Sequence, residues 1–534
     1  MRTSVDYIIV GAGPAGLQLA YHLAQAGRSY LVLERGKAAG NFFKTFPRHR
    51  TLISSNKVHT GYTDAETNMR FDWNSLLTDD HSHLFKDYTD KYFPDADTYV
   101  RYLGDFAKRF ALNIRYGTQI AKIDRQDDFC LTDSKGHTYV GKRLIMATGV
   151  TQPYIPAIPG IELIDNYTTV DVKPKSFQNQ RVLILGKGNS AFETAENLIA
   201  SSAIIHVASP HPLNLAWKTH FVGHLRAVNN NFLDTYQLKT QNALLDCTVE
   251  RIRRKNGKFV VSVKYTHAED EREDLVYDRV IACTGFRFDA SAFTPACRPA
   301  LAINDRFPDQ TSSWESVNVK DLYFAGTITQ MRDFKKTNSG FIHGYRYNVR
   351  ALARLLQTRY HGVSLARETF PATVEEVEKR ILRRVNSSSG LWQQFGFLCD
   401  VVSLDGDEAR YLEELPVDYF RDTTEWRDRR LVTVALEFGH VENDPFNIPR
   451  FPRAEKADKS TFLHPVLRYF EGGTMRTEVH LLENLYGEWR DPELHVRPLR
   501  EFLAQQLGRG RASRSTREPA LGTRRGARTA QVTR

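Results

Sequence analysis

The stretch that decides the fold is Tyr7-Ile8-Ile9-Val10-Gly11-Ala12-Gly13-Pro14-Ala15-Gly16, in which an apolar run leads directly into a glycine-rich turn. Glycines at this spacing allow a tight turn, a close approach of the main chain to a diphosphate, and close packing of the next helix. Apolar residues at helical spacing over positions 17–24 indicate that helix. The segment therefore predicts a diphosphate-binding unit, with contacts from Gly11, Gly13, Pro14, Ala15 and Gly16.

A second segment of the same kind begins at residue 182. The apolar run 182–185 precedes the turn 186–191, Gly-Lys-Gly-Asn-Ser-Ala, where alanine replaces the last glycine, a change that the fingerprint accepts. In both segments the following helix would direct its N-terminal amides and its dipole at the phosphates. Two such units are typical of a flavoprotein that also binds a nicotinamide nucleotide. We expect FAD on the first unit and the nicotinamide nucleotide on the second, held by Gly186, Gly188, Asn189, Ser190 and Ala191.

Other strand ends complete the expected cofactor contacts. The apolar run 30–33 ends at Glu34, whose carboxylate would accept hydrogen bonds from ribose hydroxyls, and Arg35 follows it. Three later strands end at small-residue turns, where larger side chains would obstruct a dinucleotide. The cofactor-binding residues predicted at these turns are Thr148, Gly149, Gly285 and Gly326.

The order of these segments predicts an α/β fold with two Rossmann-like dinucleotide-binding domains, the nicotinamide domain being inserted in the FAD domain. The FAD domain is assigned residues 1–165 and 291–360, and the nicotinamide domain residues 166–290. A helix from Gly340 to about Leu356 would direct its N-terminus at the flavin, where the helix dipole favours negative charge.

The composition changes after residue 360. Residues 361–507 predict an appended α+β region of unknown role, with a capping box at 373–376, a strand at 431–438 and a helix at 497–507. Residues 508–534 hold eight arginines and one glutamate among small polar residues, so we expect a disordered basic tail. This tail accounts for most of the net charge of +10, and we expect no nucleic-acid partner.

The second strand of the nicotinamide domain indicates whether the chain uses NADH or NADPH. Selectivity for NAD places an acid at the end of that strand, but residues 204–211 contain no carboxylate. Ser209, with Lys187, Lys218 and Arg226 as nearby cations, suits the 2′-phosphate of NADPH better. The sequence therefore predicts NADPH rather than NADH.

Cysteine usage and the N-terminal segment give expectations about chemistry and location. The five cysteines show no closely spaced pair, which argues against a dithiol relay of the chain's own and fits a reducing compartment. No apolar run is long enough to span a bilayer, and the first strand begins close to Met1. We expect a cytoplasmic protein without a signal peptide or a membrane anchor, and we assign no metal site.

Several longer strings resemble a known family. The order of GAGPAG, residues 52–57, 92–95 and 102–107, and GKGNSAFETAEN resembles flavin-containing monooxygenases. Residues 46–50, 72–77, 233–239 and 340–347 resemble an endoplasmic-reticulum branch of the same two-domain flavoproteins. This sequence departs from the linker motif of the monooxygenases, because no histidine follows Pro159-Gly160 at the expected place.

The resemblance implies an FAD- and NADPH-dependent monooxygenase that oxidises a soft centre of a small molecule through a flavin C4a-(hydro)peroxide. It places the active-site asparagine at Asn56, while positive charge on Lys57, His343 and Arg346 could stabilise the anionic reduced ring. Two alternatives stay open. One is a reductase that passes electrons to an external acceptor or a partner-protein disulfide, with residues 361–507 as a docking surface. The other is a nucleotide-sensing protein whose chemistry is vestigial.

Overall fold

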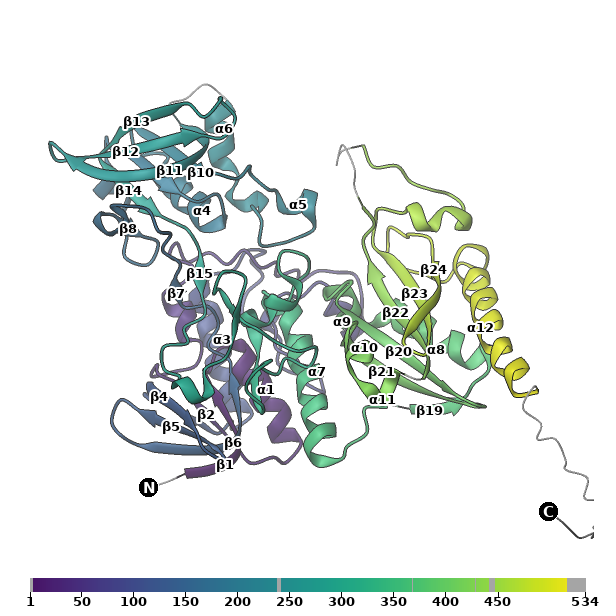
Figure 1. Cartoon of the computed structure of the whole chain (residues 1–534). Helices are drawn as coiled ribbons and strands as arrows, with labels where there is room; N and C mark the ends of the chain where they lie inside the picture. Colours follow the sequence, from purple (N-terminus) through teal and green to yellow (C-terminus); the bar gives the residue numbers. More distant parts are fainter. Residues whose placement is uncertain (1–2, 238–241, 367, 428, 441–446, 516–534) are drawn as a thin grey trace, which may run out of the picture.

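The computed structural model describes residues 3–237, 242–366, 368–427, 429–440 and 447–515. The chain forms three lobes: an FAD-type domain, a nicotinamide-type domain beside it, and a C-terminal domain on the other side of helix α7 (Ile342–His361) (Figure 1). The predicted fold class, with two Rossmann-like domains and an appended α+β region, is confirmed.

The FAD-type domain is built on a sheet in the order β3-β2-β1-β6-β5-β4, with β18 paired to β6. Strand β18 comes from beyond the inserted domain, and its parallel pairing with β6 confirms that the chain returns to the first sheet. The elements are β1 (Thr3–Val10), α1 (Pro14–Gln25), β2 (Tyr30–Leu33), α2 (Ala65–Asn68), α3 (Ala96–Arg109), β3 (Ile114–Arg115), β4 (Ile120–Arg125), β5 (Phe129–Asp133), β6 (Thr138–Met146) and β18 (Leu322–Phe324).

The glycines of the first turn are required by close main-chain contacts. Gly11 has a φ of +108°, and a Cβ there would lie 2.7 Å from the carbonyl oxygen of Ala147. A Cβ on Gly16 would lie 1.9 Å from the carbonyl oxygen of Gly11, so only glycine lets α1 begin this close to β1. Gly326, two residues after β18, has a φ of +82°, and a Cβ there would lie 2.6 Å from the side-chain Cβ of Ala15. The first turn therefore holds three strand ends together.

The nicotinamide-type domain has a sheet in the order β13-β12-β11-β10-β9-β14-β8. Its turn repeats the close contact of the first, because Gly186 has a φ of +114° and a Cβ there would lie 2.3 Å from the carbonyl oxygen of Cys283. The elements are β8 (Asp165–Asn166), β9 (Arg181–Leu185), α4 (Asn189–Leu198), β10 (Ile204–Ser209), α5 (Ala216–Thr219), α6 (Asn231–Gln237), β11 (Ala243–Lys255), β12 (Lys258–Tyr265), β13 (Arg272–Tyr277) and β14 (Arg279–Ala282).

Two short strand pairs accompany these sheets. Strands β7 (Gln152–Pro153) and β15 (Phe286–Arg287) pair where the chain leaves and re-enters the FAD-type domain, and β16 (Leu301–Ala302) pairs with β17 (Phe307–Pro308). The β7–β15 pair lies between the two nucleotide domains in Figure 1.

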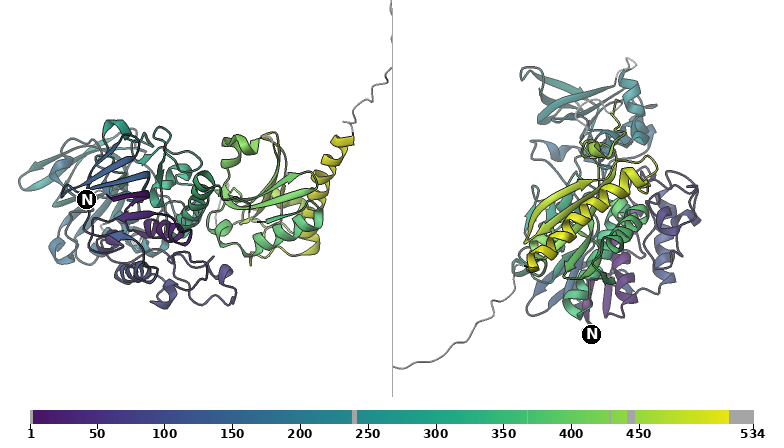
Figure 2. Two further views of the ribbon diagram at one scale, coloured as in Figure 1. Left: turned by 90° about the horizontal axis from the view of Figure 1, so that it is seen from below. Right: turned by 90° about the vertical axis from the view of Figure 1, so that its right-hand side faces the viewer.

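The C-terminal domain is a six-stranded antiparallel sheet in the order β19-β21-β20-β22-β23-β24. One face packs on helices α8 and α12, which lie on the outer side of the molecule (Figure 2), and the other faces α7. The elements are β19 (Glu368–Pro371), α8 (Val374–Ser387), α9 (Ser389–Gln393), β20 (Leu398–Asp405), β21 (Glu408–Pro416), α10 (Tyr419–Asp422), α11 (Thr424–Arg427), β22 (Arg430–Glu437), β23 (His464–Glu471), β24 (Thr474–His480) and α12 (Arg497–Ser515).

Two predictions for this domain can be compared with its helices. One half of the predicted capping box is confirmed, because the Thr373 side chain accepts a hydrogen bond from the Glu376 amide. The reciprocal half is absent between these two described residues, because the Thr373 amide donates to the Pro371 carbonyl oxygen and the Glu376 carboxylate pairs with Arg380. The boundary of the tail at residue 508 is wrong, since α12 continues to Ser515. The alanine and arginines of that stretch are good helix formers, which offsets the cost of Gly508 and Gly510. Residues 516–534 lie outside the described residues.

Over the described parts of the chain, no helix has the length and apolar character needed to cross a membrane.

The glycine contacts predict different results for two alanine substitutions in one turn. Gly16→Ala should destabilise the FAD-type domain by about 1–3 kcal/mol or more, since its Cβ would overlap main-chain atoms. Gly13→Ala is the matched control, because no atom lies within 4 Å of its Cβ, so this variant should fold normally and weaken only FAD binding. Melting temperature and flavin content measure the two effects, and equal melting temperatures for both variants would contradict the prediction.

Candidate functional site

A cavity of about 350 Å³ lies between the two glycine turns and receives side chains from both nucleotide domains. The FAD-type domain contributes Phe43, Leu52 and Trp73, and the start of α7 contributes His343. The nicotinamide-type domain contributes the opposite side of the lining, which includes Tyr167, Asn189, Ser190, Glu193 and Arg226. A flavin ring and a nicotinamide ring that extended from the two turns would meet in this cavity.

His343 is the predicted catalytic residue that the structure places on the cavity wall. It is buried, and its ring stacks on Trp73 with 4.2 Å between the centroids. Neither ring nitrogen has a hydrogen-bond partner among the described residues. Burial, together with the charges of Arg346 and Arg226, holds the pKa of His343 well below its usual range. The positive charge expected at His343 is therefore wrong, because burial disfavours the imidazolium. The neutral imidazole offers one donor and one acceptor to a molecule bound in the cavity.

Glu193 supplies a carboxyl group that the sequence analysis did not single out. It lies on α4, the helix that follows the second glycine turn, and accepts a hydrogen bond from the Tyr167 hydroxyl. Burial raises the pKa of Glu193 to about 7, and the hydrogen bond from Tyr167 opposes this shift. A carboxyl with such a pKa can donate or accept a proton near neutral pH. Its position two residues after the GxGxxA turn was the available signal.

The other predicted catalytic residues do not line the cavity. The Asn56 side-chain amide donates to the carbonyl oxygens of Thr89 (2.8 Å) and Lys91 (3.3 Å), and Lys57 is exposed. Arg346 is fully buried, but its guanidinium donates to the carbonyl oxygens of Met69, Asp72 and Ser75. Asn56 and Arg346 therefore fix the loops next to the cavity. Their direct action on a flavin, and that of Lys57, stays a prediction that these contacts do not support.

The first glycine turn has the groups expected around FAD. The Glu34 carboxylate accepts hydrogen bonds from the main-chain amides of Ala12 (2.8 Å) and Gly36 (2.7 Å), so it is fixed beside the turn. Its remaining lone pairs can accept from ribose hydroxyls. Thr148 and Gly149 follow β6 at the same edge, with nothing within 4 Å of a Cβ on Gly149. Arg35 is exposed.

The second turn matches the nicotinamide nucleotide less directly. Gly188 is open, with no atom within 4 Å of a Cβ, and Gly285 is equally open after β14. Asn189, predicted to contact the cofactor, is engaged in the protein: its amide donates to the His224 carbonyl oxygen and accepts from the Arg226 amide. Ser190 lines the cavity, whereas Ala191 is fully buried under the turn.

The region expected to hold the 2′-phosphate contains a carboxylate that the linear sequence hides. Asp246 on β11 lies opposite Ser209 in the parallel pairing with β10. Lys187 forms an ion pair with Asp246 and also donates to the carbonyl oxygens of Ser209 and His211. Arg226 does not reach this region, because it lies over Trp73 and donates to the Ile53 carbonyl oxygen at 2.8 Å. Lys187 is therefore the predicted cation that the structure brings beside Ser209.

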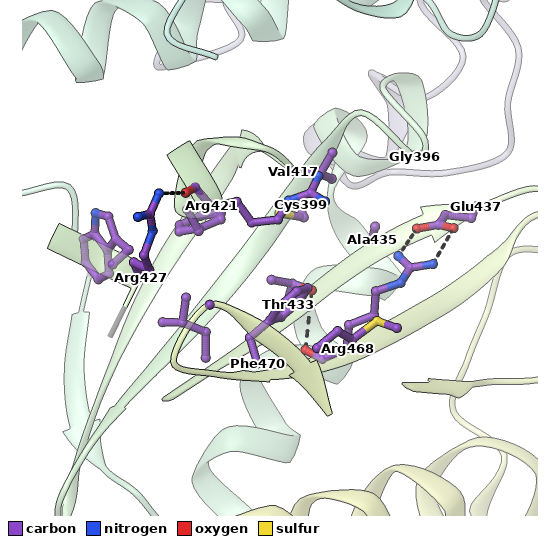
Figure 3. Close-up of a pocket in the computed structure, with 15 residues that line it drawn as sticks. Gly396, Cys399, Val417, Arg421, Arg427, Thr433, Ala435, Glu437, Arg468 and Phe470 are labelled. Atoms are coloured by element: carbon purple, nitrogen blue, oxygen red, sulfur yellow. Dashed lines mark hydrogen bonds and ion pairs between the residues drawn. The ribbon is translucent and has the colours of Figure 1, made fainter. Parts of the chain in front are cut away.

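A separate cavity of about 440 Å³ lies on the face of the C-terminal sheet, under α10 and α11 (Figure 3). Small side chains of Cys399, Thr433 and Ala435 form its floor. Two of its arginines pair with carboxylates, since Arg468 bonds Glu437 and Glu478, and Arg421 bonds Asp418. The third arginine of the lining, Arg427, donates to the carbonyl oxygen of Arg421.

Residues 8–326 match the pyridine nucleotide-disulphide oxidoreductase family. The chain belongs to this family. The mouse FAD-dependent oxidoreductase domain-containing protein 2 is 39% identical to it, over 95% of this chain and 84% of the relative. Two solved structures share the fold: a bacillithiol disulfide reductase from Bacillus cereus, with 19% identity and a TM-score of 0.52, covers 67% of this chain and 100% of its own. A flavin-containing monooxygenase from Stenotrophomonas maltophilia, with 18% identity and a TM-score of 0.51, covers 67% of this chain and 99% of its own.

These comparisons confirm the resemblance on which the sequence analysis relied. FAD and NADP(H), the predicted cofactors, are the cofactors of this family, and the two open glycine turns fit their diphosphates. The chain is therefore a flavin-dependent oxidoreductase. The family match ends before the C-terminal domain.

The buried carboxyl of Glu193 predicts a pH-dependent stability difference. Its pKa is higher in the folded chain than in the unfolded chain, so the folded state binds more protons between about pH 4.5 and about pH 7. The contribution of Glu193 to the free energy of unfolding therefore decreases as the pH rises through that range. The melting temperature of wild type should fall relative to that of Glu193→Gln between about pH 5 and about pH 8.

The matched control is Glu196→Gln, one turn further along α4, which leaves the cavity carboxyl in place. This variant should follow wild type at every pH. A constant difference between wild type and Glu193→Gln across the range would contradict the raised pKa.

The Lys187–Asp246 pair predicts how cofactor preference changes. Asp246→Asn should free Lys187 for the 2′-phosphate and remove a repelling charge, so NADPH binding should strengthen roughly two- to fivefold while NADH binding stays unchanged. Titration of each nucleotide measures this ratio. Asp274→Asn, which removes a carboxylate paired with Arg253 on the outer hairpin, is the control. An equal change for both nucleotides would contradict the assignment of Lys187.

Proposed function

We propose that this chain is an NADPH-dependent flavin monooxygenase that oxidises a soft nitrogen or sulfur centre of a small molecule. Bound FAD supplies a ring that accepts hydride from NADPH and, once reduced, reacts with molecular oxygen. The observation that carries the proposal is His343, a buried neutral imidazole with two unpartnered nitrogens on the wall between the nucleotide turns.

The geometry of the cavity supports oxygen chemistry in three ways. Aromatic side chains such as Phe43, Phe46 and Trp73 limit the access of water, which protects a reactive centre from hydrolysis. The neutral ring of His343 can donate a hydrogen bond to oxygen, and Glu193 can donate or accept a proton near neutral pH. The N-terminus of α7 directs its dipole toward the cavity and favours a negative charge on the reduced ring.

The cysteines do not provide an internal electron relay. All five are free, and the described residues that line the cavity include no cysteine. Burial raises the pKa of Cys283 to about 12, so its thiol stays protonated at neutral pH. Electrons must therefore leave the flavin to oxygen or to a molecule that enters from outside, which favours the monooxygenase over a dithiol mechanism.

Oxygen transfer can be tested with thioanisole as a soft-sulfur probe. With NADPH and ¹⁸O₂, the flavin-loaded protein should form labelled methyl phenyl sulfoxide, detected by mass spectrometry. His343→Phe keeps an aromatic ring against Trp73 but removes both nitrogens, so it should lower sulfoxide formation about a hundredfold or more. Flavin reduction by NADPH should stay intact in this variant. Hydrogen peroxide as the sole product of the wild-type protein would contradict the proposal.

A second candidate is a reductase for an external acceptor, which the name of the matched family favours. In that case NADPH oxidation under anaerobic conditions would require an added disulfide acceptor. The residues 361–507 would then serve as the docking surface for a protein partner. Rapid anaerobic turnover with a protein disulfide, together with no labelled sulfoxide in air, would support this candidate instead.

A further inference from the structure

A cleft of about 400 Å³ lies where the three domains meet, outside the cavity between the nucleotide turns. Its walls are unusually aromatic, and they come from the FAD-type domain, from the segment around α5 and from the C-terminal domain (Figure 1). The aromatic residues that line it are Trp73, Trp217, Trp392, Phe395, Phe438 and Phe462. We call this space the aromatic vestibule.

The aromatic vestibule adjoins the catalytic cavity. Trp73 and Val222 line both spaces, so they form a common wall. On the cavity side of this wall, the Trp73 ring stacks on His343. A molecule held in the vestibule is therefore separated from the catalytic cavity by a single layer of side chains.

Two buried polar atoms in the vestibule lack partners among the described residues. They are Nε of Arg70 and Oδ1 of Asn338, whose residues are 4% and 5% exposed. The other guanidinium nitrogens of Arg70 donate to the carbonyl oxygens of Val385 (3.0 Å) and Gly487 (3.5 Å). Leaving such buried groups unpaired is costly, which indicates that a ligand supplies an acceptor and a donor here.

Arg70 also carries a charge that the vestibule does not neutralise. Its guanidinium lies over the Trp392 ring at 4.8 Å from the centroid, and it makes no direct ion pair with a carboxylate among the described residues, although the Glu66 charge acts on it from nearby. Burial lowers the pKa of Arg70 to about 10, because the cation is separated from water. A ligand carboxylate would compensate this cation. In the C-terminal cavity of Figure 3, by comparison, Arg421 and Arg468 are paired with carboxylates.

We propose that the aromatic vestibule binds the substrate, and that the substrate is a planar aromatic carboxylate. The ring would lie between indole faces, the carboxylate would meet Arg70, and the reactive centre would reach the catalytic cavity past Trp73 and Val222. A volume of this size suits a small molecule rather than a protein surface. The inference rests on the proposed function, because it names the substrate class of that site.

The proposal also gives the C-terminal domain a role. Phe438 contacts His220 of the nicotinamide-type domain, with 4.0 Å between the ring centroids, and this contact closes one side of the vestibule. Trp392 and Phe395 come from α9 and the turn that follows it, and they form the opposite wall. The vestibule would not exist without the C-terminal domain.

Isothermal titration of the oxidised, flavin-loaded protein with 2-naphthoate tests the site without any turnover. We expect saturable binding at one site, and weaker binding of decahydro-2-naphthoate, the saturated counterpart. Trp217→Ala should raise the dissociation constant about tenfold, because it removes an aromatic wall whose side chain is 43% exposed and outside the core. Tyr486→Ala is the matched control, since Tyr486 is exposed next to the lining residue Leu485 but does not line the vestibule, and it should bind normally.

A second variant tests the charge. Arg70→Gln should weaken the binding of 2-naphthoate more than the binding of 2-naphthamide. General destabilisation of the protein would not produce this difference. Three results would each overturn the proposal. They are the absence of saturable 2-naphthoate binding to wild type, equal 2-naphthoate affinity of wild type and Trp217→Ala, and equal affinity of wild type for 2-naphthoate and decahydro-2-naphthoate. A failed ¹⁸O experiment with normal 2-naphthoate binding would reject the proposed monooxygenase and leave the binding site in place.

Discussion

The structure depends on main-chain contacts too close for a Cβ atom. At the first turn, Gly11 faces the Ala147 carbonyl oxygen, and Gly16 faces that of Gly11. Gly326 brings β18 against the same turn from a segment more than 300 positions later. Because these strands must end together, their loops meet at one edge of the sheet. Everything that surrounds the cofactors is attached to that edge.

Buried charges elsewhere in the chain show what a satisfied site looks like. In the C-terminal domain Arg384 bonds Asp400 at 2.7 Å and Glu414 at 2.9 Å, and Glu414 also pairs with Arg350 of α7. This network fixes the C-terminal sheet against the FAD-type domain. By contrast, His343 and Arg70 keep unpartnered buried nitrogens. In these two residues the unpartnered nitrogens belong to side chains that line a cavity.

The candidate site was only partly predictable from the sequence. His343 was found because it begins a helix that follows a strand ending at a glycine turn. Arg346 lies one turn further along α7, where its guanidinium bonds the carbonyl oxygens of the loop 69–75 instead of reaching the cavity. Asn56 bonds a neighbouring loop, a contact that no local pattern reveals. The position of Asp246 beside Ser209 was not predicted, because it depends on the pairing of two strands whose contacting residues are 37 positions apart.

The sequence by itself determined the two nucleotide-binding units, their order and their insertion, because glycine spacing and strand periodicity are local properties of the chain. It also predicted the helix that starts at the cavity and the capped helix of the C-terminal domain. Only the tertiary structure decided which side chains face the cavity, that Asp246 neutralises Lys187, and that the C-terminal domain completes an aromatic vestibule. These features depend on contacts between segments far apart in the chain, whose geometry is set by packing and not by any local pattern.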